Sequence, residues 1–147
     1  MFLVSVEHNG AGNIFPMDLV GPTDSPWFSM ALRLTSPAVE LIRQSRRMAV
    51  ASVPFSQKAI AYKLGEHHAK THIDWDSLPF AIERSPQFHL PVAAGALRVR
   101  EVYVDRCQEV GSHMLFLTLP VSDTLCQPPV ESQLFHAFYG TRQPPQL

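Results

Sequence analysis

Residues 13–54 read NIFPMDLVGPTDSPWFSMALRLTSPAVELIRQSRRMAVASVP, and their patterns predict loop, strand, tight turn, helix and strand in that order. The run WFSMALRL over 27–34 is apolar with a single charge, and it is long enough for a buried strand. It stops at Thr35-Ser36-Pro37, where we expect Ser36 to be a helix N-cap and Pro37 the first helical residue. The turn at 34–37, between the predicted strand and the predicted helix, is therefore the expected chemical centre of this stretch.

The helix predicted after this turn is amphipathic. One of its faces carries small or apolar side chains, namely Ala38, Leu41, Ile42 and Ser45. An acidic residue lies near its start and three arginines lie near its end, which complements the helix dipole.

The residues just before the helix have the chemistry of an anion site. Arg33, Thr35 and Ser36 place a guanidinium and two hydroxyls beside the free N–H groups of a helix N-terminus. A phosphate group is bound by this combination of donors. An ordinary capped helix after a strand explains the same residues without a ligand, and these residues alone leave both interpretations open.

Composition limits the class of protein. The 147 residues suit one domain, 1–147, with a substantial core, and 46% hydrophobic against 17% charged residues indicates a globular chain. The net charge of -1 and the lack of a basic block argue against nucleic-acid binding. Thirteen prolines cut the chain into short elements, which favours a β-rich architecture.

Cysteine usage and the apolar runs bear on the compartment. Cys107 and Cys126 form no CxxC or zinc-type spacing, so we expect reduced thiols in a cytoplasmic protein. The start MFLVSV lacks a basic region and meets Glu7 too soon for a signal peptide. The apolar run MLFLTLPV is too short to cross a membrane, so we expect a soluble protein with no membrane partner.

The rest of the chain reads as short strands and turns. Strands are expected over 2–7, from 11 onward with an irregular far half, and over 27–34, 47–53, 79–85, 96–107 and 113–121. A second helix is expected over 56–64, with Ser56 as its cap and Gly65 as its stop. Asn9-Gly10 and Gly111-Ser112 predict hairpins. The run 87–94 is expected to be a connection, and 66–77 a surface loop or lid.

Hydrophobic alternation changes phase within 96–107. Leu97 and Val99 share one face of the predicted strand, whereas Val102 and Val104 share the other. A bulge near 100–101 explains this change, as does a strand whose two faces are buried in different places. With six or seven strands, two small helices and no repeating strand–helix alternation, the sequence predicts a mainly β fold, a closed or nearly closed antiparallel barrel.

The order of elements resembles that of a known family. Together with the motifs NIFPMDLVG, RLTSPAVELI, MAVASVP and VGSHMLFLTLPV, it resembles the flavin reductase-like family, whose members have an FMN-binding split barrel. The resemblance covers nearly the whole chain. It implies FMN as cofactor, NAD(P)H as a possible co-substrate, hydride transfer to flavin, and a homodimer with the cofactor near the interface.

The resemblance also implies a set of site residues. Those expected to bind the cofactor are Asn13, Ile14, Phe15, Met17, Arg33, Thr35, Ser36, Ser52 and Val53. The backbone of 13–17 would face the polar edge of the isoalloxazine, and 33–36 with 52–53 would lie near the phosphate. His113 matches the histidine of a Gly-Asp-His motif and would be catalytic, where nicotinamide meets the ring. A histidine that closes a hairpin is the alternative.

The sequence departs from the family pattern at several positions. Pro16 replaces a Thr-like residue and has no N–H to donate, and Ser112 replaces the Asp of Gly-Asp-His. Asp18 stands where Ser or Thr is usual, which puts a negative charge near a ring that becomes more electron-rich on reduction. A non-catalytic FMN-binding or flavin-carrier module is therefore a second hypothesis.

The segment EHHAKTHIDWD at 66–76 supports a third hypothesis, a metal-dependent protein. Its side chains of the types that bind zinc are His67, His68, His72, Asp74 and Asp76. In a helix, His68 and His72 would share a face, but the segment is a poor helix former and matches no fixed metal motif. A solvated, ligand-gating loop is the alternative. We expect Trp75 and the aromatic residues of LFHAFYG, 134–140, to be core or dimer contacts.

Overall fold

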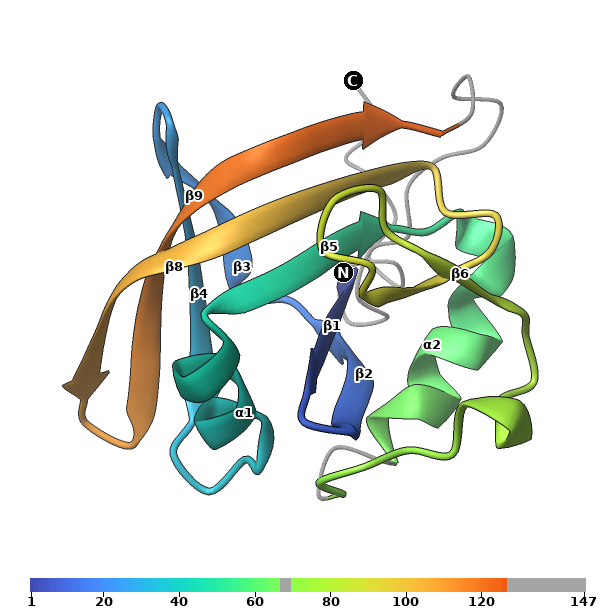
Figure 1. The fold of residues 1–147 in the computed structure, drawn as a ribbon, viewed down its shortest axis with the longest axis horizontal. Helices are drawn as coiled ribbons and strands as arrows, with labels where there is room; N and C mark the ends of the chain where they lie inside the picture. The colour runs from blue at the N-terminus through green and yellow to red at the C-terminus, as the bar shows by residue number, and fades with distance from the viewer. Residues whose placement is uncertain (67–69, 127–147) are drawn as a thin grey trace, which may run out of the picture.

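A computed structural model describes residues 1–66 and 70–126 (Figure 1). Its elements are β1 (Phe2–His8), β2 (Ala11–Met17), β3 (Val20–Asp24), β4 (Trp27–Arg33), α1 (Ala38–Ser45), β5 (Arg47–Ser52), α2 (Lys58–Gly65), β6 (Ile82–Arg84), β7 (Pro91–Ala93), β8 (Arg98–Val110) and β9 (His113–Leu125). Two 3₁₀ turns, Phe55–Gln57 and Trp75–Ser77, flank α2 and the segment that follows it. The predicted mainly β fold with two small helices is confirmed. The predicted element at 134–140 lies outside the described residues.

Seven strands form one antiparallel sheet in the order β2-β1-β5-β8-β9-β4-β3. The sheet curves around its interior, and α1 lies at one end, below β5 and between β4 and the β1–β2 hairpin (Figure 1). The hairpins at Asn9-Gly10 and Gly111-Ser112 form as predicted, and Asn9, Gly10 and Gly111 have positive φ angles. Neither helix of residues 1–66 and 70–126 has the length and hydrophobicity needed to cross a bilayer.

The barrel interior is the first core. It is built from apolar side chains of β1, β2, β4, β5, β8 and β9 with Val20 of β3, and α1 adds Ala38, Val39 and Ile42 to it. The predicted inward face of α1 is confirmed at Ala38 and Ile42, and Leu41 packs at its edge. Val39, which was not predicted to face inward, is buried as well, and Ser45 is not part of this core. The position of α1 at one end of the barrel fixes where the preceding turn lies.

A second core covers the outer face of the central strands. Ile14, Ala49 and Val99 pack there against α2, β7 and the segment that leads to β6. The central strands therefore bury both faces, which explains the change of phase in β8: Val99 faces the second core, while Val102 and Val104 face the barrel interior. The register also shifts between Glu101 and Val102, where β9 rather than β8 contains the extra residue.

Both predicted N-caps are wrong. Helix α1 begins at Ala38 after Pro37, and no side chain caps it. The Ser36 amide donates to the carbonyl of Arg33, and its own carbonyl accepts from the Val39 amide, so a backbone turn replaces the cap. Helix α2 is preceded by a 3₁₀ turn in which Ser56 lies, and its N-cap Gln57 makes no side-chain cap bond either.

Two strands were not predicted. The irregular half of the second strand is a separate edge strand, β3, which tolerates Pro22 because an edge strand does not need every N–H. The expected connection at 87–94 contains β7, which pairs with β6 and has Pro91 as its first residue. Proline obscured both strands in the sequence.

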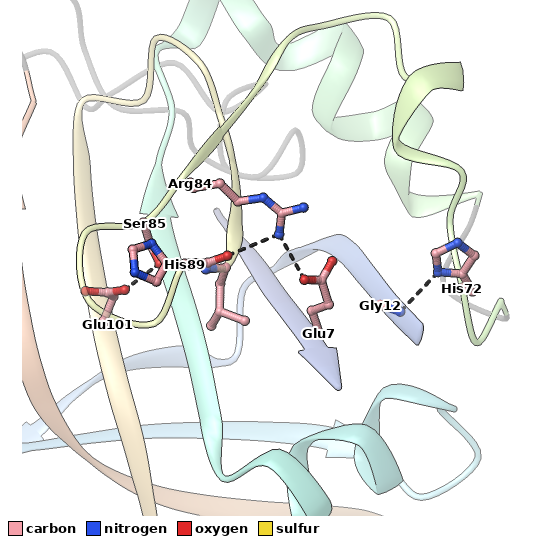
Figure 2. Close-up of polar contacts among 8 residues, drawn as sticks. Glu7, Gly12, His72, Arg84, Ser85, His89 and Glu101 are labelled. Carbon is pink, nitrogen blue, oxygen red and sulfur yellow. Dashed lines mark hydrogen bonds and ion pairs between the residues drawn. The ribbon is translucent and has the colours of Figure 1, made fainter. Parts of the chain in front are cut away.

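A buried carboxylate holds the loop between β6 and β7. Glu101 is inaccessible to solvent and accepts a hydrogen bond from the Ser85 hydroxyl (Figure 2). It also accepts one from the Ser122 hydroxyl. The amides of Gln87 and Phe88 also donate to it, at 3.0 and 2.6 Å. Burial raises the pKa of this carboxyl, but the hydrogen bonds outweigh burial and the pKa of Glu101 lies below its ordinary value.

We expect Glu101→Gln to lower the free energy of unfolding by about 3 kcal/mol at pH 7, because an amide N–H₂ would face backbone donors. A depressed folded-state pKa stabilises the fold above the ordinary value of 4.5, and this contribution is lost as pH falls through the folded-state pKa. The difference in free energy of unfolding between wild type and Glu101→Gln should therefore decrease as the pH is lowered. Urea unfolding from pH 7 to pH 3 measures it.

Glu109→Gln, at an exposed position of the same strand, is the matched control and should be neutral. Equal stability of wild type and Glu101→Gln at neutral pH would show that the buried carboxylate does not hold the loop.

Candidate functional site

A cavity of about 610 Å³ lies between the far end of β2 and the turn that joins β4 to α1. Its wall is formed by Phe15, Pro16, Met17, Asp18, Leu19, Ala31, Leu32, Arg33, Thr35, Ser36, Pro37 and His113. Three regions that are distant in sequence therefore meet in one place: the β2–β3 connection, the β4–α1 turn and the start of β9.

The β4–β9 pairing positions the polar side of the cavity. Arg33 lies opposite His113 in the ladder, and the Leu34 amide donates to the carbonyl of Ser112 at 2.9 Å. The Ser36 amide then closes the turn on the carbonyl of Arg33, also at 2.9 Å. These bonds fix the turn against the β8–β9 hairpin, so one rim of the cavity carries Arg33, Thr35, Ser36 and His113.

The polar and charged side chains of the cavity differ in the partners they have within the protein. The Arg33 side chain is exposed and makes no hydrogen bond or ion pair with any residue in 1–66 or 70–126. The carboxylate of Asp18, across the cavity, lies 3.6 Å from the amino group of Met1. His113 Nδ1 lies 3.1 Å from the Ser112 hydroxyl, so the imidazole contacts a side chain of its own hairpin. Arg33 is thus a cation available to an anionic ligand.

The β2 side of the cavity is largely apolar. Phe15 is buried, Met17 packs against the barrel interior, and Leu19 is 60% exposed beyond the strand end. An apolar wall opposite an arginine and two hydroxyls suits a ligand with a flat apolar body and an anionic end.

The structure brings most of the predicted site residues together, but not all of them. Those that line the cavity are Phe15, Met17, Arg33, Thr35, Ser36 and His113. Those that do not are Asn13, Ile14, Ser52 and Val53.

The other four predicted residues pack or form hydrogen bonds within the fold, away from the cavity. Asn13 is inaccessible, and its Nδ2 donates to the carbonyl of Lys70 at 2.7 Å. Ile14 and Val53 are in the second core. Ser52 ends β5 at the opposite end from α1, and its carbonyl accepts from the Leu97 amide at 2.8 Å. Within this chain, the first half of β2 and the end of β5 contribute nothing to the cavity wall.

Four lining residues were not assigned to the site from the sequence: Leu19, Ala31, Leu32 and Pro37. Pro16 and Asp18, which also line the cavity, were expected near the ring as departures from the family pattern. Strand alternation offered a partial signal, because Phe15, Met17 and Leu19 are spaced by two. Ala31 and Leu32 were assigned only to a buried strand, since nothing local in sequence marks a strand end as a cavity wall.

In the part of the chain that the structure describes, the segment 66–76 does not form a metal site. His67 and His68 lie outside the described residues. His72 Nδ1 accepts from the Gly12 amide at 3.2 Å, and Asp74 caps the 3₁₀ turn by accepting from the Asp76 amide. Within 1–66 and 70–126, no group of three or more His, Cys, Asp or Glu side chains is placed to hold a metal ion.

Comparison with known proteins shows the fold. No family model matches the sequence, and no curated protein matches it. Among solved structures, the chain is similar to an FMN-binding protein from Thermus thermophilus with bound p-hydroxybenzaldehyde, at 21% identity and TM-score 0.74 over 85% of this chain and 70% of that one.

Two further structures give the same result. A Streptomyces globisporus NADH:FAD oxidoreductase, SgcE6, matches at 16% identity and TM-score 0.78 over 90% of this chain and 77% of that one. The styrene monooxygenase flavin reductase from Pseudomonas putida S12 matches at 23% identity and TM-score 0.68 over 85% and 80%. The chain therefore has the split-barrel fold of flavin reductases and FMN-binding proteins, which confirms the fold expected from the sequence.

Proposed function

We propose that this protein binds FMN in the cavity between β2 and the β4–α1 turn and acts as a flavin reductase-type oxidoreductase, with NAD(P)H as the hydride donor. The observation that carries the proposal is the cavity itself. It joins an apolar wall on β2 to the start of a helix and to Arg33, whose side chain has no partner among residues 1–66 and 70–126.

The residues present fit the chemistry of FMN. A volume of about 610 Å³ falls within the range of roughly 300–1,000 Å³ that is usual for small-molecule sites. Arg33, Thr35 and Ser36 would hold the phosphate with charge-assisted hydrogen bonds. Phe15 and Met17 would pack against the apolar ring.

When bound, the flavin supplies the hydride-accepting chemistry, so the protein needs no acid–base pair. The work left to the chain is positional. Arg33 anchors the anionic end, the β2 wall keeps water from the ring, and His113 at the rim orients the nicotinamide. One of the similar structures carries the name of an NADH:FAD oxidoreductase and another that of a flavin reductase, which supports an enzymatic role.

A non-catalytic FMN-binding module is a second candidate, and one observation favours it. The carboxylate of Asp18 lies in the cavity wall, where its negative charge opposes the build-up of electron density on a reduced ring. One similar structure carries only the name of an FMN-binding protein.

A homodimer is part of the proposal. Large apolar side chains are exposed next to the cavity: Leu19 is 60% and Leu34 is 37% exposed. A second subunit seated on this rim would cover them and the cofactor together.

Replacement of Arg33 by Ala should weaken FMN binding about tenfold or more, because a charge-assisted hydrogen bond to phosphate is worth roughly 1.5–3 kcal/mol. Riboflavin, which lacks the phosphate, should lose much less affinity. Fluorescence titration of both ligands measures the difference. The melting temperature should not change, because Arg33 is exposed and makes no described side-chain bond.

Arg43→Ala is the matched control, since Arg43 is an exposed arginine of α1 that does not line the cavity. It should leave both affinities unchanged. Equal losses of FMN and riboflavin affinity in Arg33→Ala would remove the β4–α1 turn from the phosphate site.

Replacement of His113 by Ala should leave FMN affinity nearly unchanged and slow flavin reduction by NAD(P)H on the order of 10²-fold, as expected for a lost positioning contact. Stopped-flow absorbance under anaerobic conditions measures the rate. Ser112→Ala, which removes only the hydroxyl beside Nδ1, is the control and should keep most of the rate.

A lower melting temperature in both variants with normal reduction would assign His113 to the hairpin alone. If neither NADH nor NADPH reduces the flavin of the wild-type protein, the reductase proposal fails and the binding-module candidate replaces it.

A further inference from the structure

Strand β2 is an edge of the sheet, and residues 70–77, here called the strap, cover part of that edge. Gly12 lies opposite Glu7 in the β1–β2 hairpin, and both of its backbone groups bond to the strap. The Gly12 carbonyl accepts from the Ile73 amide at 2.9 Å. The Gly12 amide donates to His72 Nδ1 at 3.2 Å (Figure 2). The imidazole thus takes the place of the carbonyl that an added strand would supply.

Other contacts hold the strap close to Gly12. Ile73 is 3% exposed in the second core, and Asn13 holds the carbonyl of Lys70. A Cβ added at Gly12 would lie 2.9 Å from Cζ2 of Trp75, so no larger residue fits there without a shift. The ring of His72 also meets that of Trp75 edge to face, with centroids 6.3 Å apart.

The hydrogen bond from Gly12 depends on the protonation of the His72 imidazole, unlike the contacts that Ile73 and Asn13 make. Nδ1 accepts a hydrogen bond only when it carries no proton, whereas both nitrogens of a charged imidazole are donors. Histidine is the side chain whose charge ordinarily changes between pH 5 and 8. The His72 side chain is exposed, so solvent protons reach it.

We propose that His72 is a pH-dependent cap on the β2 edge. The neutral imidazole satisfies the Gly12 amide, and its protonation places a donor against a donor, frees that amide and loosens the strap. The charged groups on the elements around the strap are Glu7 of β1, Glu83 and Arg84 of β6, Lys58 and Lys63 of α2 with Glu66 at its C-cap, and Lys70, Asp74 and Asp76 on the strap itself. Glu7 is paired with Arg84 at 2.9 Å, and the remaining groups carry both signs. The hydrogen bond from Gly12 is the contact of His72 that protonation of Nδ1 would break.

The cap matters because of the strand that it covers. The far half of β2, at 15–17, forms the apolar wall of the cavity, and a freed amide on an edge strand is open to pairing with another chain. The device concerns the protein without ligand, so its test is independent of the proposed flavin function.

Amide hydrogen exchange by NMR tests the proposal on the intact chain. After correction for the intrinsic pH dependence, protection of the Gly12 amide should fall on the order of tenfold between pH 7.5 and pH 5.5. The Val50 amide, in the central strand β5, should keep its protection and exclude global unfolding. His72→Asn, whose Oδ1 can accept at the same place and does not titrate, should keep Gly12 protected at both pH values.

Replacement of His8 by Asn, on the neighbouring strand, is the matched control and should retain the wild-type response. In His72→Ala, the Gly12 amide should be poorly protected at pH 7.5 as well as at pH 5.5. The proposal is overturned if wild-type Gly12 is equally protected at both pH values, or if His72→Asn loses protection in acid as the wild type does.

Discussion

The pairing of β4 with β9 is the constraint on which the cavity depends. Its register places Arg33 opposite His113, and the Thr118 hydroxyl, buried in the sheet, donates to the carbonyl of Phe28 at 2.6 Å. A slip of one residue would turn Arg33 into the barrel and Leu32 out of it, because neighbours on a strand face opposite sides. The same register holds the turn at 34–37 against the β8–β9 hairpin. The candidate phosphate site is therefore a consequence of how one strand pair is aligned.

The central strands are buried on both faces, and this packing stabilises the sheet that contains the β4–β9 pair. Val50 faces the barrel interior while Ala49 and Ala51 face the second core, so β5 packs on both sides. Glu101 attaches the β6–β7 loop to β8, and the strap attaches itself to β2 through Gly12 and Asn13. The second core and the loops attached to it thus hold the central strands from outside. The cavity lies at the end of the barrel where α1 packs.

Sequence reasoning predicted what local patterns encode. Asn9-Gly10 marked a hairpin, and apolar runs marked the buried strands. The family resemblance named both the Arg33–Ser36 turn and His113 but assigned them to different parts of the flavin site, whereas the structure pairs Arg33 with His113. Sequence reasoning failed where the determining partner is remote. Ser36 was predicted as a cap because of its residue type, whereas a backbone turn makes that bond unnecessary. Glu101 looked like one more polar strand residue, since the groups that bind it come from 85–88 and from Ser122.

The most direct test of a flavin site in this cavity is the amide NMR spectrum of the protein titrated with FMN and, separately, with riboflavin. The account predicts that FMN shifts the amides of 15–19, 33–36 and His113, and that riboflavin shifts those of 15–19 while leaving Thr35 and Ser36 nearly unmoved. Shifts that avoid 33–36 and gather instead around the strap or the end of α2 would contradict it.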